Sequence, residues 1–484
     1  FVHHENDFND FNRQHLLPSF LSRPGPPMAK ADVNGDGRED IFIGGAKGQP
    51  GALFLQTADG KFLKKSSRAF EDDAPAEDVA AVFLDVDGDG DSDLYVASGG
   101  YEFAATDSLM QDRLYINDGR GNFIRSSRRL PKLLFPKSCV AVADINRDGY
   151  PDLFVGGRVA PGKYPLSPGS VILLNDGHGK FIDATATWAS ECANIGMVTA
   201  AQFVDINRDQ YPDLILAGEW MPVKILINHK NGFADASASY IKFPSNGWWN
   251  SICAGDFDGD GDQDLLIGNI GLNTQFHASP EQPLSLYYND YNKNGGLDPV
   301  MAYFIQGINY PIYSKDDLTD QLPGLKKRFL EYHDYAAAKM DDLFTADQKK
   351  DERVLKAGMM ETIYLENRGK EGFALRHLPT EVQYSPVYAM KTMDVNRDGH
   401  PDLVLAGNNA WTRIKFGRYR ANHGILLLND GKGNFSYVNQ RMSGLDIRGD
   451  VRSMQQVSTP EGPVLIFGLN DAPACTYRLN RNHF

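Results

Sequence analysis

Six short stretches of the chain place oxygen-bearing side chains at the same alternating positions. They begin at Asp32, Asp85, Asp144, Asp205, Asp256 and Asp394, and the second of them reads DVDGDGDSD. In each stretch Asp or Asn occupies positions 1, 3, 5 and 9, and Gly occupies position 6 in all but one, where Gln210 stands. Side chains at alternating positions of a tight loop can converge on one centre, and Ca²⁺ accepts about six to eight oxygen ligands. The spacing therefore predicts calcium-binding loops.

The expected ligands are the residues at positions 1, 3, 5 and 9. They are Asp32, Asn34, Asp36 and Asp40; Asp85, Asp87, Asp89 and Asp93; Asp144, Asn146, Asp148 and Asp152; Asp205, Asn207, Asp209 and Asp213; Asp256, Asp258, Asp260 and Asp264; and Asp394, Asn396, Asp398 and Asp402. A seventh loop, DYNKNGGLD, offers Asp290, Asn292, Asn294 and Asp298, and we expect it to bind more weakly because it has only two carboxylates. About six to seven Ca²⁺ ions are expected per chain.

The residues after each loop predict strands rather than helices. An EF-hand needs a bidentate Glu at position 12, but position 12 here is Ile, Val or Leu within apolar runs such as DIFIGG and DLFVGG. Each loop should therefore join two strands. A second hairpin follows at variable distance, as in RLYINDGRGNF and ILLLNDGKGNF. Two hairpins make a four-stranded antiparallel unit, the blade of a β-propeller.

The ends of the chain predict one further blade. RSMQQVS, PVLIFGL and CTYRLN give three strands without an acidic loop, and we expect the leading FVHHEN to add the fourth and close the ring. The sequence thus predicts an all-β, seven-bladed propeller that forms a single domain over residues 1–484. Within blade five, residues 274–361 form an expected insertion that contains the seventh loop and a helical pair from Ser314 to about Phe344.

The repeated loops resemble those of the FG-GAP or VCBS repeat propellers, a family that includes the head of integrin α subunits and secreted bacterial proteins. The family's namesake segment survives as GGRVAP (156–161) and more loosely as GGAKGQP (44–50). The resemblance covers nearly the whole chain and implies a calcium-binding propeller. Its members include adhesion receptors, lectin-like binders and polysaccharide lyases, so it implies no single function.

Composition excludes several classes of protein. With 49 basic and 63 acidic residues the formal charge is −14, which argues against binding to nucleic acids or anionic membranes and for binding cations. No apolar run predicts a transmembrane helix. The opening FVHHENDFND is not a signal peptide, and since Phe1 is not an initiator Met we expect a processed chain or a fragment of a larger cell-surface protein or complex. Cys139, Cys192, Cys253 and Cys475 show no metal-binding spacing, and their disulfide state stays open.

No catalytic motif is recognisable, so we turn to a binding face. In a four-stranded blade the acidic loops rim one face, and all five tryptophans fall in connections of the opposite face. The expected ligand-binding residues are Trp220, Trp248, Trp249, Trp411, Tyr101 and Arg158. Two functions remain open: a noncatalytic module that binds a glycan or a protein, which we favour, and a propeller-type polysaccharide lyase or hydrolase. Calcium sites on loops are filled where calcium is plentiful, so we expect a secreted or cell-surface protein. This expectation includes association with an outer membrane.

Overall fold

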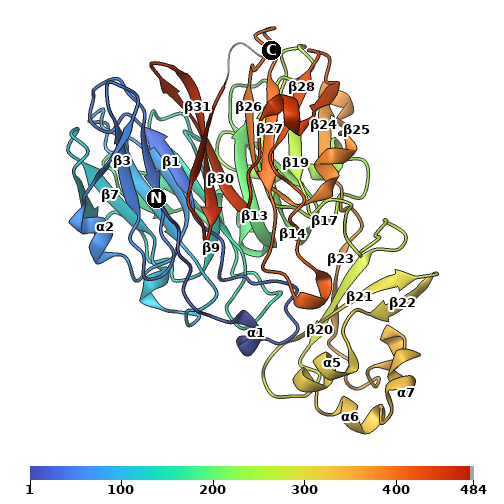
Figure 1. The fold of residues 1–484 in the computed structure, drawn as a ribbon. Helices are drawn as coiled ribbons and strands as arrows, with labels where there is room; N and C mark the ends of the chain where they lie inside the picture. Colours follow the sequence, from blue (N-terminus) through green and yellow to red (C-terminus); the bar gives the residue numbers. More distant parts are fainter. Residues whose placement is uncertain (480–484) are drawn as a thin grey trace.

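A computed structural model describes residues 1–479, which form eight antiparallel β-sheets and a few short helices (Figure 1). We number seven of the sheets in chain order and call the eighth, which lies between two strands of sheet 5, the inserted sheet. No helix within residues 1–479 is long and apolar enough to cross a membrane. Cys139, Cys192, Cys253 and Cys475 are all free thiols.

Sheets 1 to 4 follow one another along the chain. Sheet 1 contains β1 (Met28–Ala31), β2 (Asp40–Ile43), β3 (Ala52–Gln56) and β4 (Phe62–Lys65). Sheet 2 contains β5 (Asp78–Leu84), β6 (Asp93–Ser98), β7 (Arg113–Asn117) and β8 (Phe123–Ser126). Sheet 3 contains β9 (Lys137–Ala143), β10 (Asp152–Gly157), β11 (Val171–Asn175) and β12 (Phe181–Asp183). Sheet 4 contains β13 (Met197–Val204), β14 (Asp213–Met221), β15 (Lys224–Asn228) and β16 (Phe233–Asp235), with β17 (Gly247–Trp248) paired to β14.

Sheets 5 to 7 are less regular. Sheet 5 contains β18 (Ser251–Gly255), β19 (Asp264–Gly268), β24 (Ile363–Asn367) and β25 (Phe373–His377). Sheet 6 contains β26 (Val387–Met393), β27 (Asp402–Gly407), β28 (Ile425–Asn429) and β29 (Phe435–Val438). Sheet 7 has three strands, β30 (Asp450–Thr459), β31 (Gly462–Asn470) and β32 (Cys475–Arg478).

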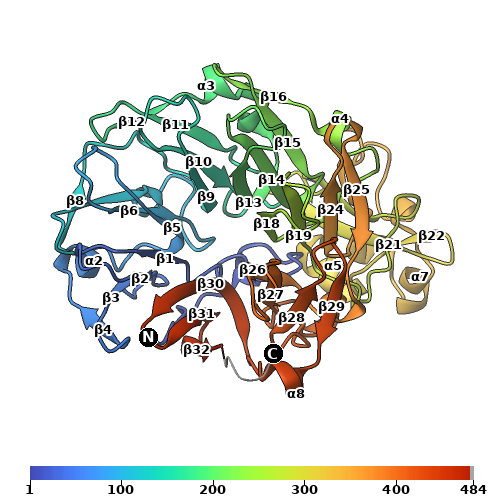
Figure 2. The ribbon, with the colours of Figure 1, turned by 90° about the horizontal axis from the view of Figure 1, so that it is seen from above.

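The seven sheets stand around a common centre, as Figure 2 shows. The first strand of each sheet contacts the first strand of the next, and β30 of sheet 7 contacts β1 of sheet 1, so the ring is closed. Second strands such as DLYVAS and DLFVGG are buried along their whole length, because each faces a neighbouring sheet on both sides. This explains their continuous apolar sequence.

The N-terminal segment meets sheet 7, but not as a full strand. Val2 forms an isolated antiparallel bridge with Pro473, and the backbone N–H of His3 donates to the carbonyl of Ala472 at 3.0 Å. The expected fourth strand is therefore reduced to a bridge beside the start of β32. After this bridge the segment continues through α1 (Asp10–Arg13) across the end of the ring before it enters β1.

The segment between β19 and β24 forms the inserted sheet and its helices, which project from the ring in Figure 1. Its strands are β20 (Leu284–Asn289), β21 (Asp298–Ile305), β22 (Ile308–Pro311) and β23 (Arg353–Ala357). The capping box expected at SKDD is present, since Ser314 and Asp317 exchange hydrogen bonds. The expected helical pair is wrong: three short helices occur, α5 (Lys315–Gln321), α6 (Leu325–Arg328) and α7 (Tyr332–Ala336). Pro323 and Gly324 separate the first two because both disfavour helix interiors.

The remaining helices are single turns in connections. They are α2 (Arg68–Asp72), α3 (Thr185–Trp188), α4 (Ser237–Tyr240) and α8 (Gln440–Ser443), with 3₁₀ turns at Ser108–Met110, Ser190–Asn194, Met340–Asp342, Gly369–Glu371, Thr380–Tyr384 and Ile414–Phe416.

Candidate metal loops and axial pocket

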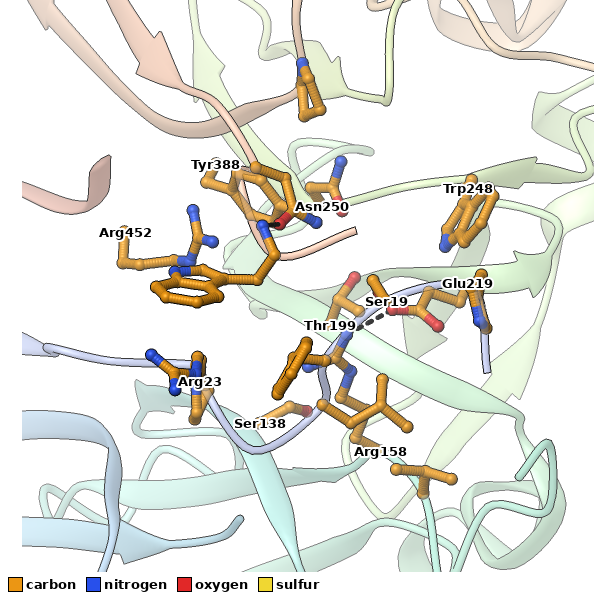
Figure 3. A pocket seen from close by; sticks show the side chains of 18 of the residues that line it. Ser19, Arg23, Ser138, Arg158, Thr199, Glu219, Trp248, Asn250, Tyr388 and Arg452 are labelled. Atoms are coloured by element: carbon orange, nitrogen blue, oxygen red, sulfur yellow. Dashed lines mark hydrogen bonds and ion pairs between the residues drawn. The ribbon is translucent and has the colours of Figure 1, made fainter. Parts of the chain in front are cut away.

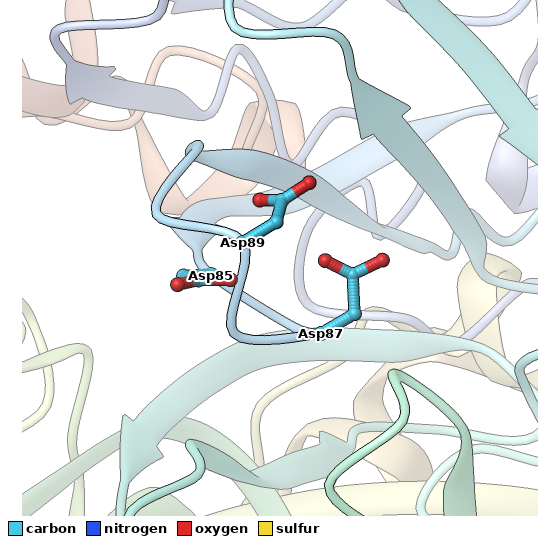
Figure 4. Close-up of side chains that lie close together, drawn as sticks. All are labelled: Asp85, Asp87 and Asp89. Atoms are coloured by element: carbon cyan, nitrogen blue, oxygen red, sulfur yellow. The ribbon is translucent and has the colours of Figure 1, made fainter.

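Every acidic loop joins the first and second strands of its sheet, so all six main loops lie at the same end of the ring. In the second loop the carboxylates of Asp85, Asp87 and Asp89 offer oxygens within 4.8 Å of one another (Figure 4). Asp256, Asp258 and Asp260 do the same in the fifth loop. The other loops carry Asn at position 3, so an amide oxygen takes the place of one carboxylate. An all-oxygen donor set of this kind suits a hard cation such as Ca²⁺.

The backbone of the loops is held in one conformation. The N–H of position 6 donates to the carboxylate of position 1 in each, for example from Gly37 to Asp32 at 2.7 Å and from Gly149 to Asp144 at 2.9 Å. Position 6 is left-handed throughout, and Gln210 adopts it too, with φ of 69°. The residue at position 4 is also left-handed, and in four loops it is Arg or Lys, namely Arg147, Arg208, Lys293 and Arg397. Sequence reasoning had missed this second left-handed position.

The Asp at position 9 ties the loop to the third strand of its own sheet. Asp152 is fully buried, and its carboxylate accepts the N–H of Ile145 at 3.1 Å and that of Asn175 at 2.8 Å. The same pair of bonds recurs in all six main loops. Burial, with a smaller contribution from the other loop carboxylates, raises the pKa of Asp152 to about 7 and that of Asp93 to about 6. The loops are thus places where negative charge is costly without a cation.

In sheets 2 to 6, an Asn at the end of the third strand links the sheet to the preceding one. The side-chain amide of Asn175 donates to the carbonyl of Val86, at position 2 of the neighbouring sheet's loop, at 2.9 Å. Equivalent bonds are made by Asn117, Asn228, Asn367 and Asn429. We call these five residues the Asn latches. The sequence could have predicted the Asn latches, since LYIND, ILLND and LLLND all end their strands with Asn. We had assigned this Asn only to the turn that follows the strand.

The seventh loop differs in its support. It joins β20 and β21 of the inserted sheet, and Asp298 is fully buried like its counterparts. One carboxylate oxygen accepts the N–H of Tyr291 at 3.0 Å, whereas the other accepts the side-chain amide of Gln321 from α5 at 2.6 Å. A helix of the insertion therefore replaces the third-strand Asn.

A pocket opens at the opposite end of the ring from the six main loops, where the first strands begin (Figure 3). Its volume is about 180 Å³. The residue six positions before the first Asp of the loop lines it in five sheets, and these residues are Val79, Ser138, Thr199, Asn250 and Tyr388. Since each first strand leads to its loop over the same distance, this offset brings the five residues to one level. We call this cavity the axial pocket.

The N-terminal segment covers one side of the axial pocket. Residues 18–21, Arg23 and Pro24 contribute to its lining. They are held by residues 411–413, because the N–H of Phe20 donates to the carbonyl of Trp411 at 2.8 Å and the N–H of Arg413 to that of Pro18 at 2.9 Å.

Three arginines and two aromatic rings give the axial pocket its chemistry. The guanidinium of Arg23 lies 3.7 Å from the centre of the Trp411 ring, and that of Arg452 lies 4.3 Å from the centre of the Tyr388 ring. Arg158 is paired with Glu219 (Figure 3). The buried Nε atoms of Arg23 and Arg158 have no hydrogen-bond partner among residues 1–479. The pocket is therefore lined by arginine side chains beside flat apolar surfaces.

Only three of the six expected ligand-binding residues line the axial pocket, and the other three are buried outside it. Trp248, Trp411 and Arg158 line the axial pocket. Trp220 lies behind it, with its ring 5.3 Å from that of Trp248 and its Nε1 donating to the Tyr164 hydroxyl. Tyr101 is fully buried and donates to Gln14.

The predicted ligand-binding role of Trp249 is the one that the structure contradicts most clearly. It is fully buried in the core between sheets 4 and 5, and its Nε1 donates to the carbonyl of Ser245 at 3.0 Å. The expectation that it faces a ligand is wrong: Trp249 directly follows β17 and its side chain packs into the core, whereas Trp248, the last residue of β17, lines the pocket. Arg23, Glu219, Tyr388 and Arg452 were missed, although the constant offset before the loops could have found Tyr388.

Three comparisons with known proteins bear on the repeats. A family model described as an FG-GAP-like repeat matches residues 32–96, 85–155 and 205–267, and each range contains two acidic loops. Integrin alpha-V of Gallus gallus is 30% identical over 155 residues, 27% of this chain. The matched part spans only 14% of that integrin's length.

Two solved structures align over nearly the whole chain at low identity. The V. cholerae biofilm matrix protein Bap1 has 11% identity and a TM-score of 0.37, over 100% of this chain and 91% of that one. The Dos1 propeller has 8% identity and a TM-score of 0.43, over 99% of this chain and 96% of that one. The matched repeats and the integrin-like sequence together support an FG-GAP repeat β-propeller family for this chain.

Proposed function

We propose that this chain is a calcium-stabilised, extracellular β-propeller that binds a glycan or protein ligand without catalysis. In this proposal sheets 1 to 7 are the seven blades of one domain, and residues 274–361 are an insertion in the fifth. The observation that carries the binding function is the axial pocket, in which arginine side chains and aromatic rings from separate segments of the chain converge.

The charge and geometry of the acidic loops support the proposal that they bind calcium. The acidic oxygens of Asp85, Asp87 and Asp89 already lie within 4.8 Å of one another, and buried carboxylates at position 9 have raised pKa values. Six or seven divalent ions would offset about all of the formal charge of −14. Residues at positions 1, 3, 5 and 9 would hold the ions, and the ions would brace the ends of the first strands.

The axial pocket limits the size of what it accepts. At about 180 Å³ it is smaller than the roughly 300–1,000 Å³ typical of sites for drug-sized molecules. It would therefore take one terminal sugar or one side chain of a larger ligand. Trp411 and Tyr388 offer flat faces for a sugar ring or an apolar side chain, and the arginines offer hydrogen bonds to its polar edge.

An extracellular location is part of the proposal for two reasons. The matched relative is an integrin, and loop-borne calcium sites function where calcium is abundant. The alternative of a polysaccharide lyase or hydrolase stays open because Glu219 and Tyr388 also line the pocket, and such groups can transfer protons.

A glycan array and a turnover assay on acidic and neutral polysaccharides would separate binding from catalysis. We expect a glycan or peptide to be retained without cleavage, and we expect Trp411→Ala to weaken retention at least tenfold. Trp188→Ala is the matched control, since Trp188 lies in α3 outside the axial pocket. Cleavage of any polysaccharide that Trp411→Ala abolishes would favour the enzyme instead.

A further inference from the structure

Three carboxylates outside the acidic loops are buried together where the N-terminal segment meets sheets 1 and 2. They belong to Glu5 in that segment, to Glu77 just before β5 and to Glu102 shortly after β6. The side chains of Glu5 and Glu77 are fully buried, and Glu102 is 7% exposed. Burial raises the pKa of both Glu5 and Glu77, and charge repulsion adds to it, from Glu102 on Glu5 and from Glu5 and Glu102 on Glu77. They therefore form one electrostatic group.

Protein donors leave most of this group unsatisfied. Glu5 Oε2, Glu77 Oε1 and both carboxylate oxygens of Glu102 have no hydrogen-bond partner among residues 1–479. Ionised carboxylates are rarely buried in this way without a compensating charge, because the desolvation cost is several kcal/mol per ion.

No cationic side chain within residues 1–479 pairs with Glu77 or Glu102. Glu5 has only His3, at 4.0 Å, and burial lowers the pKa of His3 to about 4, so that imidazole is neutral at pH 7. Arg23 pairs instead with Asp471 at 3.8 Å. Arg23 and Lys47 act on Glu5 and Glu102 only through longer-range attraction, which lowers the pKa of each carboxyl. No Lys or Arg side chain within residues 1–479 therefore forms a direct ion pair with the group.

An amide oxygen adds an independent indication of a ligand. Asn470 is 4% exposed, and its Nδ2 donates to Glu5 Oε1 at 2.5 Å, which places its amide group against the carboxylates. Its Oδ1 has no partner among the described residues. Five unpartnered oxygens thus remain on these four buried residues, a donor set that a hard cation satisfies and that an anion or a neutral apolar molecule does not.

We propose that Glu5, Glu77, Glu102 and Asn470 bind one Ca²⁺ ion, which joins the N-terminal segment to sheets 1, 2 and 7. We call it the closure site. It is separate from the acidic loops and lies toward the other end of the strands. Unlike the group of Asp85, its carboxylates do not all lie within 4.8 Å of one another, so the ion would draw the long Glu side chains inward. Calcium tolerates such flexible, irregular coordination.

Counting bound ions tests the proposal directly. The probe is Ca²⁺ itself, measured per chain by native mass spectrometry and by elemental analysis after exhaustive dialysis against a defined free calcium concentration. We expect Glu102→Gln and Glu77→Gln each to hold one ion fewer than the wild-type chain. The matched control is Glu71→Gln, because Glu71 is exposed on α2 and should leave the count unchanged. If neither Glu102→Gln nor Glu77→Gln folds, Glu5→Gln on the N-terminal segment gives the same comparison.

Two outcomes would overturn the closure site. The first is an equal ion count in the wild-type chain and in all three closure-site variants. The second is neutralisation of the carboxylates by protons instead of calcium. In that case the wild-type chain at saturating calcium would become more stable as the pH falls from 7 toward 5, and Glu102→Gln would not. The number of bound ions would be the same at both pH values. Failure of the acidic loops to bind calcium is distinguishable, since the wild-type chain would then hold one ion and the variants none.

Discussion

Single residues of the acidic loops carry backbone strain as well as ligand oxygens. Gln210 occupies a left-handed position with φ of 69°, where the other loops place Gly. A left-handed conformation costs a residue with a side chain roughly 1–2 kcal/mol. At position 6, the fourth loop is therefore the only one of the described loops in which a change to Gly should relieve strain.

We predict that Gln210→Gly raises the free energy of unfolding by about 1 kcal/mol, because the gain in the folded loop exceeds the greater freedom of Gly in the unfolded chain. Gly149→Gln is the reverse change at the matching position of the third loop, where a Cβ would meet nothing within 4 Å. It should lower stability by a similar amount. Urea unfolding in saturating calcium measures both, and a lower stability for Gln210→Gly would contradict the strain argument.

Trp249 and Trp411 should respond differently to truncation. Trp249→Ala should lower the free energy of unfolding by about 3–5 kcal/mol, because it empties a fully buried site between two sheets. Trp411→Ala should cost clearly less, since Trp411 is half-buried beside the axial pocket. Thermal and urea unfolding of the two variants provides the comparison. Equal losses would show that Trp411 is also a core residue.

At the scale of elements, the Asn latches join sheets 1 to 6, each to the one before it. Each latch connects the third strand of one sheet to the loop of the sheet before it. A displacement of one loop should therefore shift the third strand of the next sheet. The position-9 Asp binds the backbone of the same Asn, and therefore loop, strand and neighbouring loop are fixed together.

Removal of one latch should destabilise the ring more than its single hydrogen bond suggests. We predict that Asn175→Ala lowers the free energy of unfolding by about 1–3 kcal/mol, because the carbonyl of Val86 is left buried without its donor. Asn122→Ala is the matched control, since Asn122 is exposed and bonds only to Asp118 in its own turn. Urea unfolding should show almost no change for the control. Indistinguishable variants would mean that water replaces the latch at no cost.

The sequence predicted the repeated elements well and their exceptions poorly. The acidic loops, the buried second strands and the hairpins follow local rules, so 6 loops could be placed at strand 1–2 turns from their spacing alone. The helical pair at 314–344 failed because Pro323 and Gly324 interrupt a helical apolar pattern. The prediction for Trp249 failed because the sequence does not show which of two adjacent tryptophans packs into the core and which lines the pocket. Arg23 and Glu102 depend on contacts between distant segments, which no local pattern contains.

At the scale of the whole molecule, two sets of contacts close the ring, and neither is a complete added strand. β30 contacts β1, and the N-terminal segment adds only the bridge between Val2 and Pro473. We predict that deletion of residues 1–6 lowers the melting temperature and promotes aggregation, because the edge of sheet 7 loses its cover and the closure site loses Glu5. Differential scanning fluorimetry and light scattering would show both. Full retention of stability would mean that contacts between β30 and β1 suffice.

The central claim is that calcium neutralises and braces the acidic loops, and the most direct measurement is the calcium content of the purified chain by elemental analysis. The formal charge of −14 and the repeated all-oxygen loops predict about six to seven loop-bound ions, with one more if the closure site is filled. Removal of these ions by a chelator should lower the melting temperature sharply, because each site at a hundredfold excess over its Kd contributes about 2.7 kcal/mol. Fewer than about three calcium ions per chain under saturating conditions would contradict the account.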